Sequence, residues 1–270
     1  MGKKIGICLT GGGARGSYQI GAIQALKELD ILDKISSFSG TSIGSANAAV
    51  VASTGLEKAK KIWFEMPENN IPKNTPLKKK TDLLKAERGF YSMKVFEDVM
   101  LRSIDYDALR KKEVFVTVAK AGNEHDGFFE LIKRSLNHRF KKISQAYYLP
   151  LHELSNETIH RAIIASCSIP VVFAPVTIDG KKYCDGGICD NVPIAPLVDA
   201  GCDEIIIVYL HKYNASVKSK AYPNVTFHEI KHDKARELGR VLKFSHKQTK
   251  ALYQYGYDDT MALFRSLQDA

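Results

Sequence analysis

A serine between glycines and a separate run of glycines are the residues of this chain best suited to chemistry. Ser42 is the third residue of a Gly-Thr-Ser-Ile-Gly pentapeptide, and residues 11–16 read Gly-Gly-Gly-Ala-Arg-Gly. A serine hydroxyl attacks a carbonyl at neutral pH only when a base takes its proton and hydrogen-bond donors stabilise the oxyanion that forms. The pattern therefore predicts Ser42 as a nucleophile and the glycine run as its oxyanion hole.

Both motifs lie where the sequence predicts a strand that turns tightly into a helix. Residues 4–10 alternate and are rich in Ile and Leu, and apolar residues recur at helical spacing after the glycines. Residues 35–39 form a second apolar stretch that runs into the serine motif, and small residues follow it. Gly40 and Gly44 relieve crowding at such an elbow, so that the hydroxyl of Ser42 is exposed at a helix N-terminus, where the dipole favours negative charge.

The glycine run has two interpretations. As an oxyanion hole, it contributes the amides of Gly12 and Gly13 as preferred donors, while Gly16 supports the motif and Arg15 adds a positive charge at the same turn. The run also fits the dinucleotide fingerprint Gly-x-Gly-x-x-Gly, which requires an acidic residue about 20 positions further on, at the end of the next strand. That strand leads into the serine motif instead, so the sequence disfavours nucleotide binding.

A candidate base is Asp185, which is followed by Gly186 and Gly187. Short strand-like segments flank a turn at residues 179–180, and we expect this hairpin to deliver Asp185. A carboxylate that acts as base for a serine needs a partly desolvated pocket, which raises its pKa, and a direct hydrogen bond to the hydroxyl. An ordinary turn aspartate is the alternative interpretation of the same residue.

Histidines provide two further alternatives. The chain order serine, aspartate, histidine permits a triad with His211, His228 or His232 as base, although Ser42 follows only the second strand, earlier than in an α/β-hydrolase. Residues 228–232 also fit the zinc-protease pattern His-Glu-x-x-His, which needs a helix to bring both imidazoles to one face. The residues before this pattern are typical of a strand, which disfavours a zinc peptidase.

Length and composition favour one large α/β domain. The chain has 270 residues, of which 44% are hydrophobic and 26% charged. Strand-like segments such as 114–119 and 205–210 alternate with helical ones, which implies an α/β sandwich. We expect a single domain over residues 1–270, with a cap or lid at about 63–110 and a basic helical tail at about 211–270. Within this tail, the apolar spacing that includes Leu238 and Val241 predicts a long helix from about residue 233.

Composition and charge also indicate the cellular compartment of the protein and the class of its binding partners. No apolar run approaches the ~20 residues of a membrane-spanning helix, and no apolar signal region precedes the first strand, so we expect a cytoplasmic protein. Lys and Arg exceed Asp and Glu by 39 to 30, a net charge of +9 that attracts anionic partners. Without a nucleic-acid motif we expect no nucleic-acid binding. The five cysteines lack Cys-x-x-Cys spacing and suit packing roles.

Taken together, the motifs closely resemble those of the patatin-like phospholipase family. Two further segments carry the resemblance, the Ala-Ser-Cys-Ser-Ile-Pro run and its continuation over 165–175 and the Asn-Val-Pro at 191–193, and it covers most of residues 4–210. It implies a three-layer sandwich with a mostly parallel central sheet and helices on both faces. It also implies that Ser42 and Asp185 form a dyad without histidine, and that Gly11 to Gly13 with Arg15 form the oxyanion hole.

The resemblance further implies hydrolysis of acyl esters of phospholipids or lysophospholipids without a metal or cofactor. An acyl-enzyme would form on Ser42 and be resolved by water that Asp185 activates. Because such substrates lie in bilayers, we expect peripheral contact with an anionic membrane surface through the cap or tail. A non-catalytic lipid-binding module of the same fold is the remaining alternative, since a fold does not guarantee a reaction.

Overall fold

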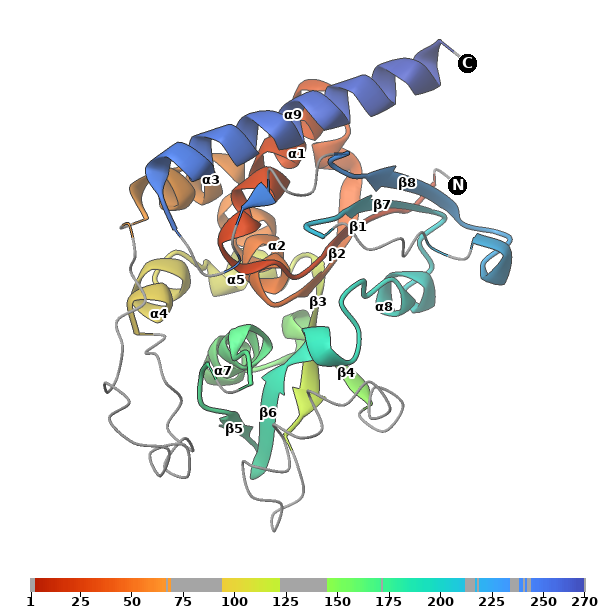
Figure 1. Ribbon diagram of the computed structural model, residues 1–270. Helices are drawn as coiled ribbons and strands as arrows, with labels where there is room; N and C mark the ends of the chain where they lie inside the picture. The colour runs from red at the N-terminus through yellow and green to blue at the C-terminus, as the bar shows by residue number, and fades with distance from the viewer. Residues whose placement is uncertain are drawn as a thin grey trace.

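A computed structural model of the chain describes residues 3–66, 68, 94–121, 145–170, 172–211, 217, 219–233, 238, 239, 241 and 244–269. Its centre is a mixed sheet with helices on both sides (Figure 1). The cap predicted for about 63–110 lies in large part outside the described residues, as do parts of the basic tail predicted from 211. The division of the chain into one domain with a cap and a tail therefore stays a prediction.

The sheet is mostly parallel. From one edge to the other its strands are β5 (Val176–Ile178), β6 (Lys181–Asp185), β3 (Glu113–Lys120), β2 (Ile35–Thr41), β1 (Ile5–Leu9), β7 (Glu204–Val208) and β8 (Thr226–Ile230), and β4 (Ala146–Pro150) pairs with β3. The five neighbouring strands β3, β2, β1, β7 and β8 run parallel to one another. Strands β4 and β6 pair antiparallel with β3, and β5 pairs antiparallel with β6. The predicted α/β architecture with a mostly parallel sheet is confirmed.

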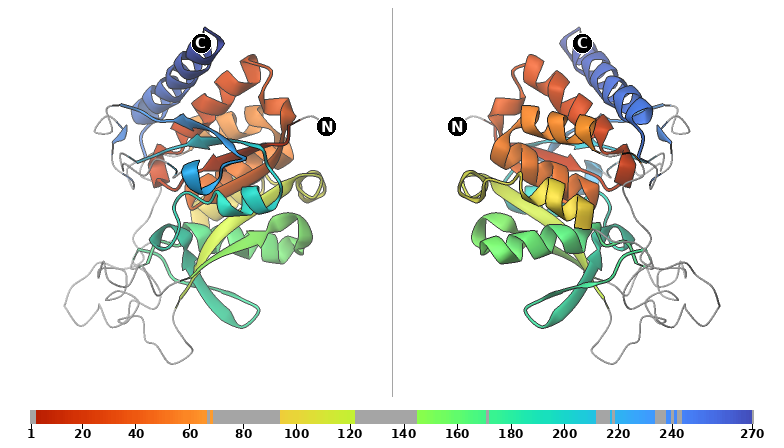
Figure 2. Two further views of the ribbon diagram at one scale, coloured as in Figure 1. Left: turned by 90° about the vertical axis from the view of Figure 1, so that its right-hand side faces the viewer. Right: turned by 90° about the vertical axis from the view of Figure 1, so that its left-hand side faces the viewer.

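The helices divide between the two faces of this sheet. They are α1 (Ser17–Glu28), α2 (Ile43–Thr54), α3 (Leu56–Glu65), α4 (Lys94–Leu101), α5 (Tyr106–Leu109), α7 (Asn156–Cys167), α8 (Ala195–Asp199) and α9 (His246–Gln268), with short 3-10 turns η1 (Gly13–Arg15), η2 (Leu32–Lys34), η5 (Leu151–Glu153), η6 (Gly186–Ile188) and η7 (Ser219–Ala221). The side views show α1, α2 and α3 grouped together with α9 beside them (Figure 2).

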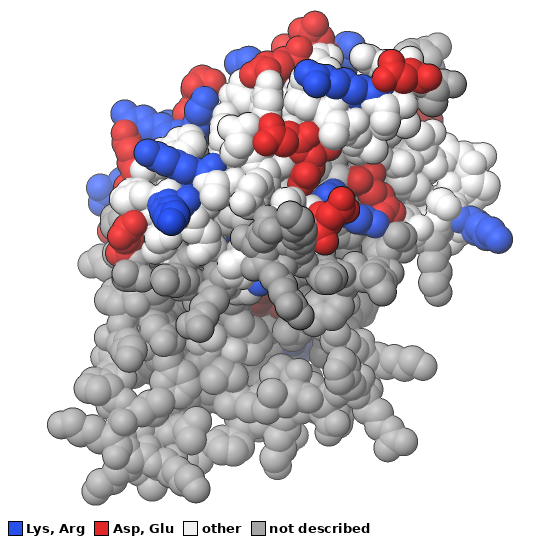
Figure 3. All heavy atoms as spheres, turned by 45° about the horizontal axis from the view of Figure 1, so that its top comes forward, with Lys and Arg blue, Asp and Glu red and all other residues white. Residues whose placement is uncertain are grey.

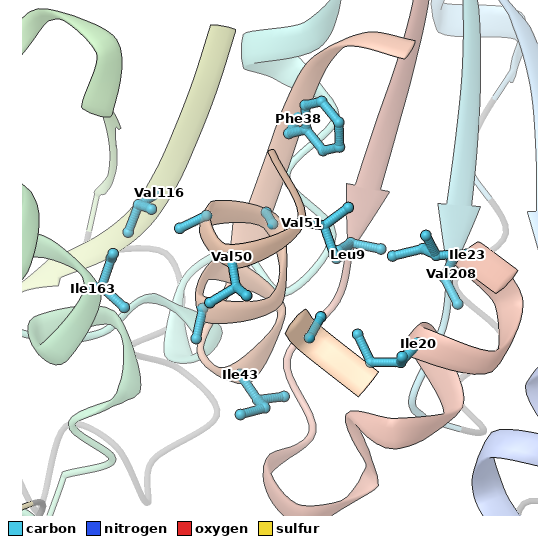
Figure 4. Packing of buried hydrophobic residues seen from close by; sticks show 14 of the residues in the cluster. Leu9, Ile20, Ile23, Phe38, Ile43, Val50, Val51, Val116, Ile163 and Val208 are labelled. Carbon is cyan, nitrogen blue, oxygen red and sulfur yellow. The ribbon is translucent and has the colours of Figure 1, made fainter. Parts of the chain in front are cut away.

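Alternation along the central strands separates two hydrophobic clusters. Leu9 and Val208 belong to the larger cluster, in which side chains from β1, β7, α1 and α2 meet (Figure 4). Cys8 and Ile207, one residue away on the same strands, belong to the smaller cluster beneath Leu197 of α8. Because successive side chains of a strand point to opposite faces, both faces of β1 and β7 are covered.

The predicted hairpin at residues 179–180 is confirmed. The hairpin of β5 and β6 turns at Asp179 and Gly180, which both have positive φ, and Ser155 caps α7 through its side chain. The long C-terminal helix predicted from about residue 233 begins only at His246, where Ser245 accepts a hydrogen bond from the N–H of Gln248. No helix in the described part of the chain is both long and apolar enough to span a membrane.

Candidate active site

Ser42 lies at the junction between β2 and α2, in a backbone conformation that is rare for a residue with a side chain. Its φ and ψ are 56° and −130°, and it is the N-cap of α2. Such a conformation costs about 1–3 kcal/mol and persists only where the surroundings impose it. The neighbouring glycines permit it: a Cβ on Gly44 would lie 2.1 Å from the carbonyl oxygen of Leu9, and one on Gly40 would lie 2.5 Å from the backbone of Gly44.

Two buried serines form hydrogen bonds with the backbone N–H and carbonyl of Ser42. The N–H of Ser42 donates to Oγ of Ser166 at 2.9 Å, and the hydroxyl of Ser166 donates in turn to the carbonyl of Thr117 at 2.7 Å. The hydroxyl of Ser45 donates to the carbonyl of Ser42 at 2.6 Å. Ser166 is part of the 165–175 segment, and the motifs of the sequence predict no role for it. A serine within the apolar run of residues 162–167 was the signal that could have found it.

The strand register brings Asp185 to the same place. β2 and β4 both pair with residues 115–117 of β3, so they lie on opposite edges of β3. β6 pairs with residues that also pair with β4, so it lies on the same edge as β2. β2 ends with Thr41 opposite Thr117, and β6 runs the other way and ends with Asp185 opposite Val118. The carboxyl ends of β2 and β6 therefore meet end to end.

Asp185 is a buried carboxylate in contact with the serine. Residues Ser42 and Asp185 are 7% and 6% exposed. The hydroxyl of Ser42 lies close enough to the Asp185 carboxylate to lower its pKa, and the N–H of Gly187 donates to its Oδ1 at 2.7 Å. Burial outweighs both of these contacts and raises the pKa of Asp185 to about 6. The carboxylate is thus ionised at neutral pH and is more basic than an exposed aspartate.

The loop after Asp185 connects it to the glycine turn. Gly186 and Gly187 open η6 directly after the strand. Further along, Oδ1 of Asn191 accepts a hydrogen bond from the N–H of Gly11 at 3.1 Å. The hydroxyl of Thr41, the residue before the serine, donates to the carbonyl of Asp190 at 3.0 Å. The three sequence motifs thus meet at the carboxyl ends of β1, β2 and β6.

The glycine turn runs from the end of β1 to α1 and presents two amides. The N–H of Gly11 is bonded to Asn191, and the N–H of Ala14 donates to a carbonyl at 2.7 Å. Within the described part of the chain, the N–H groups of Gly12 and Gly13 have no protein acceptor. Gly16 caps α1 and closes the turn with a hydrogen bond to the carbonyl of Gly13 at 3.1 Å.

Arg15 directs its guanidinium to backbone carbonyls around the turn. Nη2 and Nε donate to the carbonyl of Gly239 at 2.7 and 3.1 Å, and Nη1 donates to the carbonyl of Leu210 at 3.1 Å. Nη1 also lies 3.2 Å from Nδ1 of His211. Since these groups accept hydrogen bonds from Arg15, its side chain holds the turn in place.

The candidate histidines bond elsewhere. Because a guanidinium only donates, Nδ1 of His211 accepts from Arg15, and the protonated ring nitrogen donates to the carbonyl of Gly11. Burial and the adjacent Arg15 lower the pKa of His211, which keeps it neutral at pH 7. His228 bonds to Glu204 at 2.8 Å and His232 to Asp259 at 2.9 Å.

The zinc-protease alternative fails on local geometry. His228 lies within strand β8 and not on a helix, and the two imidazoles bond to different carboxylates, His228 to Glu204 and His232 to Asp259. Among the residues that the structure describes, no group of three or more His, Cys, Asp or Glu side chains is arranged to hold a metal ion.

A comparison with protein-family models decides the family. The model described as patatin-like phospholipase matches residues 7–198. The chain belongs to the patatin-like phospholipase family. It is 27% identical over 223 residues to an uncharacterized NTE family protein of Mycobacterium bovis, covering 83% of this chain and 53% of that protein. It is also 30% identical over 210 residues to a lysophospholipase, NTE1, of Coccidioides immitis, covering 77% of this chain and 11% of that protein. The chain thus spans about half the length of the mycobacterial relative.

Two solved structures share the fold. VipD from Legionella pneumophila matches with a TM-score of 0.53 at 15% identity, over 98% of this chain and 67% of that one. Human GIVD cytosolic phospholipase A2 matches with a TM-score of 0.55 at 10% identity, over 98% of this chain and 59% of that one. At these identities the likeness concerns the architecture alone.

Proposed function

We propose that the protein is a serine acyl hydrolase that cleaves fatty-acyl esters of phospholipids or lysophospholipids through a Ser42/Asp185 dyad. The observation that carries this proposal is the placement of Ser42 and a buried carboxylate, Asp185, at the meeting ends of β2 and β6, with the pKa of that carboxylate raised to about 6 by burial. A base of this pKa is ionised at pH 7 and accepts a proton more readily than an exposed aspartate. The family and the lysophospholipase relatives support the substrate class.

The first half-reaction forms an acyl-enzyme. Oγ of Ser42 attacks the ester carbonyl carbon as its proton passes to Asp185. The carbonyl oxygen becomes an oxyanion that accepts hydrogen bonds from the N–H groups of Gly12 and Gly13, helped by the N-terminal end of the α2 dipole. The intermediate collapses when the bond to the alcohol oxygen breaks and Asp185 returns the proton to that oxygen. The alcohol leaves, and the acyl group stays on Ser42.

Water completes the cycle. Asp185 takes a proton from a water molecule that attacks the acyl carbonyl, and a second oxyanion forms in the same amide pair. When this intermediate collapses, Oγ of Ser42 leaves and recovers the proton from Asp185, and the fatty acid is released. In this scheme Gly11 and Arg15 hold the glycine turn, and Gly40, Gly44, Gly186 and Gly187 allow the backbone segments to approach each other.

The decisive experiment combines active-site labelling with an ester assay. A fluorophosphonate probe should label Ser42, as shown by peptide mapping, and a soluble short-chain ester should be hydrolysed. Ser42→Ala should abolish both, and Asp185→Asn should abolish hydrolysis while the protein stays folded. Ser53→Ala is a matched control, because Ser53 lies near the far end of the same helix. Equal hydrolysis by wild type and Ser42→Ala would end the proposal and favour the non-catalytic alternative.

Peripheral binding to anionic membranes is part of the same proposal, supported by the net charge of +9. On the face that carries α9, basic and acidic side chains are intermingled (Figure 3), so the described residues of that face form no patch of a single sign. The lysine-rich runs at 78–80 and 139–142 lie outside the described residues. Binding to phosphatidylserine vesicles should be present at low ionic strength and weaken with salt, and its absence at low salt would indicate soluble substrates.

A further inference from the structure

Residues far beyond the family domain contact the glycine turn. The family model ends at residue 198, but Leu238, Gly239 and Val241, here called the strap, lie against η1. The strap precedes α9 in the chain and is separated from the turn by more than 200 residues of sequence. It is therefore an addition to the part of the chain that the family defines.

The strap bonds to the residues that follow the proposed oxyanion donors. The carbonyl of Val241 accepts from the N–H of Ala14 at 2.7 Å, and the carbonyl of Gly239 accepts both Nη2 and Nε of Arg15. Gly13, with φ of +57°, packs so tightly on the strap that a Cβ would lie 2.3 Å from the carbonyl oxygen of Val241. These contacts fix the peptide planes on the C-terminal side of the donors.

Helix α9 holds the strap in turn. Nε2 of Gln248, in the first turn of α9, donates to the carbonyl of Leu238 at 3.2 Å. The helix itself lies along α1, the helix that begins directly after the glycine turn (Figure 1). The two approach closely at glycines, because a Cβ on Gly21 would lie 1.8 Å from the carbonyl oxygen of Tyr253. One C-terminal unit thus supports both the turn and the helix that follows it.

The other side of the turn contacts the residues that follow β7. Arg15 donates to the carbonyl of Leu210 and to the ring of His211, which donates to the carbonyl of Gly11. Arg15 is the residue that joins this support to the strap. A guanidinium suits this position because it holds several donors in a fixed plane, which an ammonium group does not.

We propose that the strap and Arg15 are positioning elements that set the direction of the Gly12 and Gly13 amides, so that segments outside the family domain complete the oxyanion hole. The inference rests on the proposed function. Loss of correctly aimed oxyanion donors lowers the rate of the chemical step, and removal of one donor in a well-studied protease costs about 10²–10³ in kcat. A misaimed pair should cost less, on the order of tenfold, with little change in KM.

The test uses full-length variants and a soluble short-chain ester. Gln248→Ala removes the anchor of the strap, and Arg15→Lys keeps the charge but loses the planar set of donors. Both should lower kcat about tenfold with an unchanged KM, and the acid limb of the pH profile set by Asp185 should stay in place. Gln254→Ala is the matched control, since Gln254 lies on the same helix and its side chain donates to exposed Asp258.

Two more readouts separate positioning from general damage. If Arg15 and Gln248 act through one chain of contacts, the double variant should be barely slower than either single variant. In Arg15→Ala, millimolar guanidinium should restore part of kcat. Wild-type kcat in folded Gln248→Ala and Arg15→Lys, with Ser42→Ala inactive, would overturn this inference alone. Activity retained by Ser42→Ala would overturn the proposed function instead. If Arg15→Lys fails to fold, Gln248→Ala decides.

Discussion

Replacing Asp185 with asparagine should change how the stability of the protein depends on pH. Burial raises the pKa of this carboxyl to about 6 in the folded protein, whereas an aspartate in an unfolded chain has a pKa of about 3.9. A shift of about two pKa units corresponds to about 3 kcal/mol of free energy. The ionised carboxylate is thus a cost to the fold, and the neutral amide of Asp185→Asn avoids it.

The sign follows from proton binding. Below about pH 4 the carboxyl is protonated in both states and the cost is absent. Between about pH 4 and pH 6 the unfolded chain releases the proton while the folded protein keeps it, so the free energy of unfolding of the wild type falls as the pH rises. Above about pH 6 the folded protein also ionises and the full cost remains. The Asp185→Asn variant has no such group, so its advantage over the wild type grows with pH.

Urea unfolding of both proteins from pH 4.5 to pH 8 measures this effect. The difference in unfolding free energy between variant and wild type should rise by about 2 kcal/mol over that range, since the first third of the change falls below pH 4.5. Other titrating groups are the same in both proteins and cancel. Asp107→Asn serves as control, because that side chain is 98% exposed, and its difference should stay nearly flat. A flat difference for Asp185→Asn would refute the raised pKa and with it the basis for a carboxylate acting alone.

Further predictions concern the neighbours of the dyad. The kcat/KM for a soluble, uncharged ester should rise with pH to a plateau with an apparent pKa of about 6, because Asp185 accepts a proton only when ionised; a midpoint below pH 4.5 would contradict this. Ser42→Gly should be inactive yet more resistant to urea than Ser42→Ala by about 1 kcal/mol, since glycine tolerates the φ of 56°, and equal stability would argue against strain. Ser166→Ala should cost about 1–3 kcal/mol in unfolding free energy and lower kcat, because the buried N–H of Ser42 loses its acceptor, whereas Ser53→Ala should do neither. His211→Gln should slow hydrolysis of the same ester without abolishing it or moving the acid limb; a loss as complete as in Ser42→Ala would favour the triad.

Local patterns in the sequence were sufficient for most of the fold. Residues 205–210 predict a buried parallel strand, and β7 is that strand at Glu204–Val208. The prediction that differs from the structure concerns the segment before α9, where apolar residues are buried without forming one face of an α-helix. Leu238 and Val241 suggest a helix from about residue 233, but they belong to the strap, where the buried Leu238 is in a 3-10 and not an α-helical conformation. Apolar spacing reports which residues are buried, and a left-handed Gly239 with φ of 72° shows why the chain is not α-helical at that position.

For the candidate site, the sequence indicated the reactive groups but not what holds them. Ser42 and Asp185 stand in short motifs whose residue types carry the chemistry. The contacts of Ser166, Asn191 and the strap join segments that are distant in the chain, and no local pattern encodes them. The ambiguity over His211 has the same origin, since only the structure shows that its ring nitrogens face Arg15 and the carbonyl of Gly11.

The strained backbone of Ser42 and the buried charge of Asp185 both cost free energy of folding, so they persist only if the surrounding structure is rigid. A buried polar network behind the turn supplies part of that rigidity. Nδ2 of Asn47 on α2 donates to the carbonyl of Gly16 at 3.0 Å and to Oε1 of Gln19 at 2.9 Å. Gln19 donates to the carbonyl of Thr10 at 2.8 Å, and the indole N–H of Trp63 donates to Oδ1 of Asn47 at 2.8 Å. The network therefore ties both ends of the glycine turn to the helix that begins at the nucleophile. A buried network whose members are all bonded is costly to break at any point, so the distance between nucleophile and oxyanion donors is set by the same contacts that stabilise the core.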